Sequence, residues 1–213
     1  MKSDEVGSDY VYFPDSESSA HDYLLPVVTR LLQQNQQRDA RAGRLFEWGC
    51  GNAYCAARLQ AAGFDVTGID LSATGVQVAN AKHPLLKIKQ GSVYDSQVAT
   101  YGTFPAVLSM EVVEHLLAPR KLVANMFEML APGGIAIVTT PFHGYWKNLA
   151  LALTGRMDAH FTALWDGGHV KFWSMATLDT LLREAGFVDI RFERVGRIPP
   201  LAKSMIAIAY KPA

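Results

Sequence analysis

The chain has 213 residues, a length that suits one domain or one domain with an insertion. With 49% hydrophobic and 19% charged residues, it has the composition of a globular protein and not of a disordered one. Lys plus Arg and Asp plus Glu number 20 each, so the net charge gives no electrostatic case for a nucleic-acid partner.

The remaining bulk features predict a protein of the reducing cytoplasm. The first nine residues are acidic and polar, which is unlike a signal peptide. No apolar run approaches the ~20 residues needed to span a bilayer. The only cysteines, Cys50 and Cys55, indicate neither a disulfide framework nor a metal-ligand pattern.

The pattern along the chain predicts a flexible N-terminal segment over residues 1–18 and a single domain over 19–213. Apolar residues at helical spacing indicate a first helix over 19–37. Alternating segments then predict a doubly wound, mostly parallel α/β sheet. The expected strands are 44–48, 65–69, 85–90, 105–109, 134–140, 187–195 and 203–210, and the expected helices are 53–62, 72–81, 119–130 and 174–185, with a turn over 130–134.

An apolar and aromatic insertion interrupts this alternation at about 142–172. A segment of this kind at the carboxyl edge of a sheet is typical of a lid or a substrate-binding element. Two alternatives stay open. Its helical part, around Trp146 and Leu153, either contacts a membrane peripherally or packs its apolar face on its own domain.

The most informative motif is the segment that ends the first expected strand, with Glu47, Gly49 and Gly51. The two glycines allow a tight turn and a close approach of the backbone to a ligand. Glu47 would repel a pyrophosphate but suits a cation. Among adenosyl cofactors, S-adenosylmethionine carries cationic groups, its ammonium and its sulfonium.

Asp70 ends the second expected strand, close to the spacing at which an acidic residue bonds ribose hydroxyls in dinucleotide folds. Two strand-end carboxylates, Glu47 and Asp70, then flank one nucleoside. The alternative is a glycine turn that only connects a strand to a helix.

Together these features resemble the class I S-adenosylmethionine-dependent methyltransferases, over residues 20 to 210. The resemblance rests on Glu47-x-Gly49-x-Gly51, on Asp70, and on the segments 109–116 and 130–134. It implies a Rossmann-like, seven-stranded sheet whose last strand is antiparallel. Two positions depart from the family pattern. Ala53 stands where many members have a third glycine, and Pro105 stands where an aspartate often opens the fourth strand.

The resemblance also implies a role for individual residues. Glu47, Gly49 and Gly51 would hold the methionine part of the cofactor, and Asp70 would hold its ribose. Leu71, which follows Asp70, and Ser92 and Val93, which follow the third strand, are expected to contact the cofactor as well. Met110, at the end of the fourth strand, is expected beside the transferred methyl.

Within the class, the chain is most similar to the ubiquinone-biosynthesis O-methyltransferases. The shared features are Glu-x-x-Glu-His after the fourth strand, at 111–115, and the segment 168–172 at the end of the insertion. The same Glu-x-x-Glu-His with a distant histidine is similar to the metal site of plant small-RNA 2′-O-methyltransferases.

A metal site is therefore predicted at Glu111, Glu114, His115 and His169. The first three stand at i, i+3 and i+4, which share one face of a helical turn. Mixed oxygen and nitrogen ligands suit Mg²⁺, Mn²⁺, Fe²⁺ or Zn²⁺. The alternative is that Glu114 and His115 only cap or ion-pair a short helix.

The expected reaction is methyl transfer to a small aromatic or apolar acceptor, at a phenolic or catechol-like hydroxyl. A metal would lower the pKa of that hydroxyl, and without one His115, His143 or His169 would act as general base. We expect His21 to be solvated. Alternatives are metal-free N- or C-methylation, a nicotinamide-dependent oxidoreductase, or a protein that binds the cofactor without catalysis.

Overall fold

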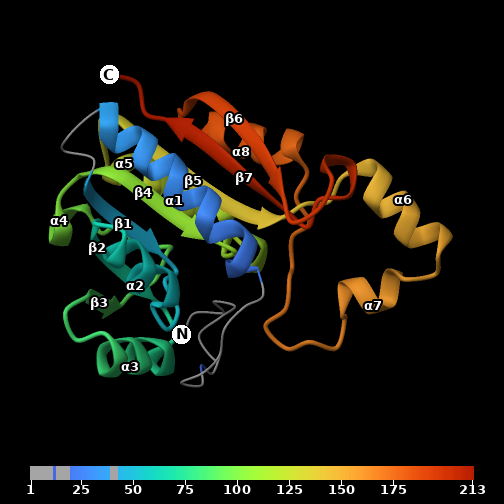
Figure 1. The fold of residues 1–213 in the computed structure, drawn as a ribbon, viewed down its shortest axis with the longest axis horizontal. Coiled ribbons are helices and arrows are strands. Elements are labelled where there is room, and N and C mark those ends of the chain that lie inside the picture. The colour runs from blue at the N-terminus through green and yellow to red at the C-terminus, as the bar shows by residue number, and fades with distance from the viewer. Residues whose placement is uncertain (1–11, 13–19, 39–42) are drawn as a thin grey trace.

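A computed structural model of the chain describes Tyr12, residues 20–38 and residues 43–213. The remaining residues are drawn as a grey trace in Figure 1. The predicted flexible segment 1–18 therefore lies outside the described residues, except for Tyr12.

Seven strands form one sheet in the order β3-β2-β1-β4-β5-β7-β6 (Figure 1). The strands β3, β2, β1, β4 and β5 run parallel to one another, whereas β7 is antiparallel to both β5 and β6. The predicted doubly wound sheet with an antiparallel last strand is confirmed. The strands are β1 (Arg44–Trp48), β2 (Asp65–Asp70), β3 (Lys87–Gln90), β4 (Phe104–Met110), β5 (Leu130–Pro141), β6 (Val188–Val195) and β7 (Ser204–Tyr210).

Helices cover both faces of the sheet, so its central strands are buried on both sides. On one face lie α1 (His21–Arg38), α2 (Tyr54–Ala61) and α3 (Ala73–Lys82), and on the other lie α4 (Val98–Tyr101), α5 (Pro119–Met129) and α8 (Met175–Glu184). The insertion carries α6 (Tyr145–Leu153) and α7 (Met157–Phe161), and two short 3-10 turns are η2 (Val113–His115) and η3 (Pro199–Leu201).

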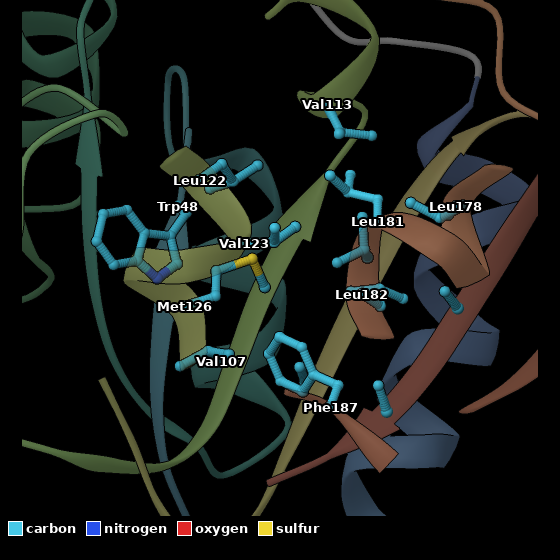
Figure 2. Packing of buried hydrophobic residues seen from close by; sticks show 14 of the residues in the cluster. Trp48, Val107, Val113, Leu122, Val123, Met126, Leu178, Leu181, Leu182 and Phe187 are labelled. Atoms are coloured by element: carbon cyan, nitrogen blue, oxygen red, sulfur yellow. The ribbon is translucent and has the colours of Figure 1, made fainter. Parts of the chain in front are cut away.

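Alternate residues of β1 illustrate how a central strand of the sheet contributes to both hydrophobic clusters. Leu45 belongs to the cluster under α1 and α2, whereas Phe46 and Trp48 belong to the cluster under α5 and α8. Figure 2 shows the second cluster, where Met126 and Phe187 are fully or almost fully buried. Burial of one such side chain is worth about 1.5–3 kcal/mol relative to exposure.

The segment Leu130 to Gly134 differs from the predicted turn, because β5 begins at Leu130, directly after α5 ends at Met129. The backbone here is already paired. Leu130 pairs with Phe104 of β4, and the N–H of Gly133 donates to the carbonyl of Lys211 at 3.1 Å. The short helices α4 and α7 were not predicted, whereas α6 lies where the helical part of the insertion was expected.

The order of the strands determines where a ligand can bind. The chain runs from β1 outward to β3 and then returns to β4 on the other side of β1. Loops leaving β1 and β4 therefore diverge at the carboxyl edge, the usual ligand position of an open α/β sheet. In the part of the chain that the structure describes, none of the helices is both long and apolar enough to cross a membrane.

The insertion leaves the sheet and returns to it at adjacent points. Phe142 and Trp173 form a parallel bridge, and the N–H of His143 donates to the carbonyl of Trp173 at 2.9 Å. Between these points, α6 and α7 extend away from the sheet (Figure 1), and no residue of either helix is buried.

Candidate functional site

A cavity of about 520 Å³ lies at the carboxyl ends of β1, β2 and β4. Parallel strands that end at one edge bring together residues far apart in sequence. Most of the predicted site residues line it, namely Glu47, Gly49, Gly51, Asp70, Leu71, Val93, Met110, Glu111, Glu114, His115 and His169.

The glycine turn after β1 forms one wall of this cavity. Gly49 and Gly51 have φ values of 75° and 53°, a region that favours glycine. A Cβ at Gly49 would lie 2.5 Å from a methyl of Val112, and one at Gly51 would lie 2.7 Å from the hydroxyl of Tyr12. Ala53 takes the same left-handed conformation with φ 62°, so it occupies the geometry of the glycine that it replaces.

Asp70 ties this turn to the end of β2. Its Oδ2 accepts the backbone N–H of Gly51 at 2.7 Å, and its Oδ1 accepts the N–H of Ser72 at 2.8 Å. Burial raises the pKa of this carboxyl, and the two bonds oppose that rise. The carboxylate thus fixes two loops on the cavity wall.

Glu47 is a buried acid with one carboxylate oxygen that lacks a partner. Its Oε2 accepts no hydrogen bond from any described residue, although the side chain is only 2% exposed. Burial, followed by the nearby charge of Asp70, raises its pKa to about 8. An uncompensated buried carboxyl is costly, and a cationic group in the cavity would supply the missing partner.

Three of the four predicted metal ligands come together. One ligand atom each from Glu114, His115 and His169 lies within 4.8 Å of the others, and His169 Nε2 is 4.0 Å from Glu114 Oε1. Glu114 is 1% exposed, and neither carboxylate oxygen has a hydrogen-bond partner among the described residues. Burial and the neighbouring Glu111 hold its pKa well above the ordinary value.

The hydrogen bond of His115 leaves one of its ring nitrogens available as a ligand. His115 Nδ1 lies 2.9 Å from the carbonyl of Gly167. A carbonyl only accepts, so Nδ1 carries the proton and Nε2 keeps its lone pair. Burial lowers the pKa of His115, and burial with the charge of His115 lowers that of His169 to about 4, so both are neutral at pH 7.

Backbone contacts bring the end of the insertion to this cluster. The N–H groups of Val170 and Lys171 both donate to the backbone carbonyl of Glu114 at 2.9 Å. His169 is therefore held beside Glu114 although the two are far apart in sequence.

Glu111 departs from the predicted ligand geometry. It lies before η2 with a φ of 52°, so Glu111, Glu114 and His115 do not share one helical face, and that expectation was wrong. Its Oε1 accepts from the hydroxyl of Thr139 at 2.9 Å. Burial raises its pKa to about 7, against the opposing bonds from Thr139 and Ser204.

Two other predicted residues lie outside this cavity. Ser92 does not line it, and its hydroxyl accepts the N–H of Tyr94 at 3.0 Å. His143 lines a second cavity of about 460 Å³, which shares Glu111 and His169 with the first. Burial and the charge of Lys147 lower the pKa of His143 to about 4.

Several residues that line the first cavity were not predicted from the sequence. His21, expected to be solvated, lines the first cavity and stacks on Tyr54 with 5.1 Å between ring centroids. Asn52 and Trp165 also line it. Proximity to the glycine turn could have indicated Asn52 and Tyr54, whereas the return of Trp165 depends on how the insertion folds.

Comparisons with known proteins agree with this geometry. A family model described as a methyltransferase domain matches residues 19–191. The chain is similar to the ubiquinone biosynthesis O-methyltransferase of Psychrobacter arcticus, with 29% identity over 72% of this chain and 63% of the relative. The enzyme of the same name from Cereibacter sphaeroides is 32% identical over 76% of this chain and 69% of the relative.

A solved structure shares the fold at low identity. Magnesium protoporphyrin IX methyltransferase from Synechocystis PCC 6803, with bound SAH, superposes with a TM-score of 0.65 at 16% identity, over 88% of this chain and 83% of that one. The chain spans only 46–63% of the length of several curated relatives that it matches.

Proposed function

Because the chain belongs to the family of methyltransferase domains, we propose that it transfers the methyl group of S-adenosylmethionine to a hydroxyl oxygen of a small-molecule acceptor. The observation that carries this proposal is Glu47, a buried carboxyl without a full set of partners beside a glycine turn. Membership in this family favours methyl transfer over the nicotinamide-dependent oxidoreductase considered as an alternative.

The residues that line the first cavity support binding of this cofactor. Glu47 would pair with the ammonium of the methionine part, above the backbone of Gly49 and Gly51. Asp70 would accept a ribose hydroxyl, since a carboxylate oxygen offers two lone pairs and each of its oxygens uses one for a backbone N–H. Leu71 and Val93 would supply apolar contacts for the nucleoside, and Met110, at the end of β4, would lie beside the transferred methyl.

The reaction makes limited chemical demands on the protein. In-line displacement breaks the bond between the methyl carbon and sulfur and forms a carbon–oxygen bond. The sulfonium becomes a neutral thioether, and the acceptor loses its hydroxyl proton. The protein has to align the two reactants and accept that proton. Without a metal, His115 or His169, which line this cavity, would accept the proton as general base.

We propose that Glu114, His115 and His169 hold a divalent metal ion in this site. The residues fit, because the two oxygens of Glu114 lack partners and the Nε2 of His115 is left with a lone pair. When bound, such an ion lowers the pKa of a nearby hydroxyl and orients it. Glu111 lines the same cavity and accepts a hydrogen bond from Thr139. It would therefore lie next to the metal site without being one of the three ligands.

Two observations support oxygen as the methylated atom and an aromatic or apolar acceptor. The curated relatives are named as O-methyltransferases of ubiquinone biosynthesis. In addition, the insertion contributes Trp165 to the first cavity and Phe172 to the second. We propose that the insertion acts as a lid over this acceptor, and contact of its exposed apolar residues with a membrane stays an alternative.

The test has two arms. Calorimetric titration should show binding of S-adenosylhomocysteine and none of NADH. A screen of phenols, catechols and amines with labelled S-adenosylmethionine should then give transfer to a hydroxyl. Binding of NADH in preference to S-adenosylhomocysteine would refute the cofactor, and transfer only to amines would refute O-methylation.

A further inference from the structure

The second cavity is lined by several positive charges. Lys147, Arg156, Arg197 and Lys203 all line it, whereas Glu111 is the one acidic residue among the described residues of its wall. Two of the three N–H donors of Lys147 go to the backbone carbonyls of Phe142, at 2.8 Å, and Lys203, at 3.4 Å. The cavity therefore concentrates positive charge although the chain has no net charge.

These cations have one acidic neighbour in the described wall, Glu111, whose charge favours the charged form of Lys147. Ion pairs within the described ranges join other residues, and none of them involves Lys147, Arg156, Arg197 or Lys203. Burial and the charge of Arg197 lower the pKa of Lys147 to about 8. Clustered cations repel each other, so an anion in the cavity would relieve a cost that the free protein carries.

The second cavity adjoins the proposed site of methyl transfer. Glu111 and His169 line both cavities, so an acceptor in the second can present an atom to the first. Its apolar residues, including Leu151 and Phe172, suit the carbon frame of such a molecule. The volume of about 460 Å³ falls in the usual range for a small molecule, roughly 300–1,000 Å³.

From this arrangement we propose that the acceptor carries an anionic oxygen group, a carboxylate or a phosphate, that the second cavity binds through Arg156, Arg197 and Lys147. The acceptor hydroxyl then lies at the wall formed by His169 and Glu111. This inference rests on the proposed function, since it treats the second cavity as the acceptor side of the methyl-transfer site.

The first experiment measures binding without any reaction. Protein saturated with S-adenosylhomocysteine is titrated calorimetrically with benzoate, phenyl phosphate and phenol. We expect one or both anions to bind about tenfold or more tightly than phenol, because charge-assisted hydrogen bonds are about twice as strong as neutral ones. Their affinity should fall as salt is raised, and the stronger of the two identifies the anionic group.

Variants locate the anion. Arg156 and Arg197 are exposed, so the double variant Arg156→Gln, Arg197→Gln should fold normally. It should weaken binding of the preferred anion by about tenfold, and leave binding of phenol and S-adenosylhomocysteine unchanged. The double variant Arg156→Lys, Arg197→Lys should retain most of the affinity, and Lys89→Gln, on the exposed edge strand β3, serves as the matched control.

The second experiment separates this inference from the proposed function. Methyl transfer to catechol is compared with transfer to 3,4-dihydroxybenzoate and to 3,4-dihydroxyphenyl phosphonate. We expect a lower KM for an anionic acceptor, and a rise in that KM with little change in kcat in the Arg156→Gln, Arg197→Gln variant. Anion binding that the variant weakens, without turnover of any acceptor, would support the subsite and count against the function. Turnover of catechol with no anion binding, or anion binding that the variant leaves unchanged, would overturn the subsite and leave the function standing.

Discussion

Asp70 Oδ2 accepts the backbone N–H of Gly51 at 2.7 Å, across 19 positions of sequence. The same carboxylate receives the N–H of Ser72 at 2.8 Å, and Ser72 in turn caps α3 through the N–H of Gly75 at 3.1 Å. A residue expected only to bind ribose thus also organises the loops that form the proposed cofactor site.

The first prediction is that Asp70→Ala weakens S-adenosylhomocysteine binding and lowers stability together. Loss of hydrogen bonds to a charged group should cost about 1.5–3 kcal/mol of binding, roughly ten- to a hundredfold in Kd. Calorimetry and thermal unfolding measure the two effects. Asp65→Ala, on the same strand but exposed and paired with Lys87, is the control. Unchanged affinity in Asp70→Ala would refute the ribose assignment.

The second prediction is that Glu47 releases a proton when the cofactor binds. Its pKa of about 8 in the free protein means that it is mostly protonated at pH 7, whereas a paired ammonium favours the charged form. Binding of S-adenosylhomocysteine should therefore release up to about one proton, and affinity should rise with pH until about pH 8. Calorimetry in buffers of different ionisation enthalpy counts that proton.

Stability of the free protein should show the opposite trend. Because the folded pKa of Glu47 lies above the ordinary value of 4.5, its stabilising contribution is complete below that value and is lost as the pH rises through about 8. Glu47→Gln should thus raise the Tm of the free protein at pH 8, abolish proton release and weaken cofactor binding. If this variant released as many protons as the native protein, another group would have to be responsible.

The third prediction concerns Gly49 and Val112. Gly49→Ala combines an unfavourable φ of 75° with a contact of 2.5 Å to Val112, so it should lose about 1–2 kcal/mol of stability from the backbone term and more from the collision. Adding Val112→Ala should recover the collision part only. Denaturant unfolding of the single and double variants checks this, and simple additivity of the two losses would contradict the contact.

The fourth prediction is that methyl transfer depends on metal. Chelation should abolish turnover and spare S-adenosylhomocysteine binding, because the proposed cofactor contacts, Glu47 and Asp70, are separate from Glu114, His115 and His169. His169→Ala should behave like the chelated protein, and Glu47→Ala should lose cofactor affinity but keep the metal. Affinity for the metal should fall at acid pH as protons compete for the ligands. Full activity in extensively chelated protein without metal by elemental analysis would falsify the site.

The fifth prediction is that the insertion is the least protected internal part of the free protein. Neither α6 nor α7 has a buried residue, and elements with few buried contacts open at low free energy. Amides of residues 145–165 should exchange fast in the free protein and more slowly with cofactor and acceptor bound. Slow exchange across this range in the free protein would identify a rigid structural element instead of a lid.

Most strands and helices were predictable because their apolar residues recur at the spacing typical of each element. Residues such as Leu45, Phe46 and Trp48 form short apolar runs, and buried parallel strands require such runs. The acids Glu47 and Asp70 stand at strand ends, and parallel strands gather those ends at one edge. The sequence alone therefore predicted the sheet and the strand-end residues that line the first cavity.

Only the tertiary structure decided which side chains of the insertion reach that edge. His169 arrives beside Glu114 through backbone bonds from Val170 and Lys171, whereas His143 is directed into the second cavity. Glu111 has a left-handed backbone and precedes the 3-10 turn η2, so it does not lie on one face with Glu114 and His115. The spacing of residues in the sequence does not indicate such a conformation. The second cavity brings Lys147 and Arg156 of the insertion together with Arg197 and Lys203, which lie between β6 and β7. These residues meet because the insertion folds back over the hairpin formed by β6 and β7. Spacing along the chain carries no information about such contacts, because each depends on the path of a whole loop and not on the period of one element.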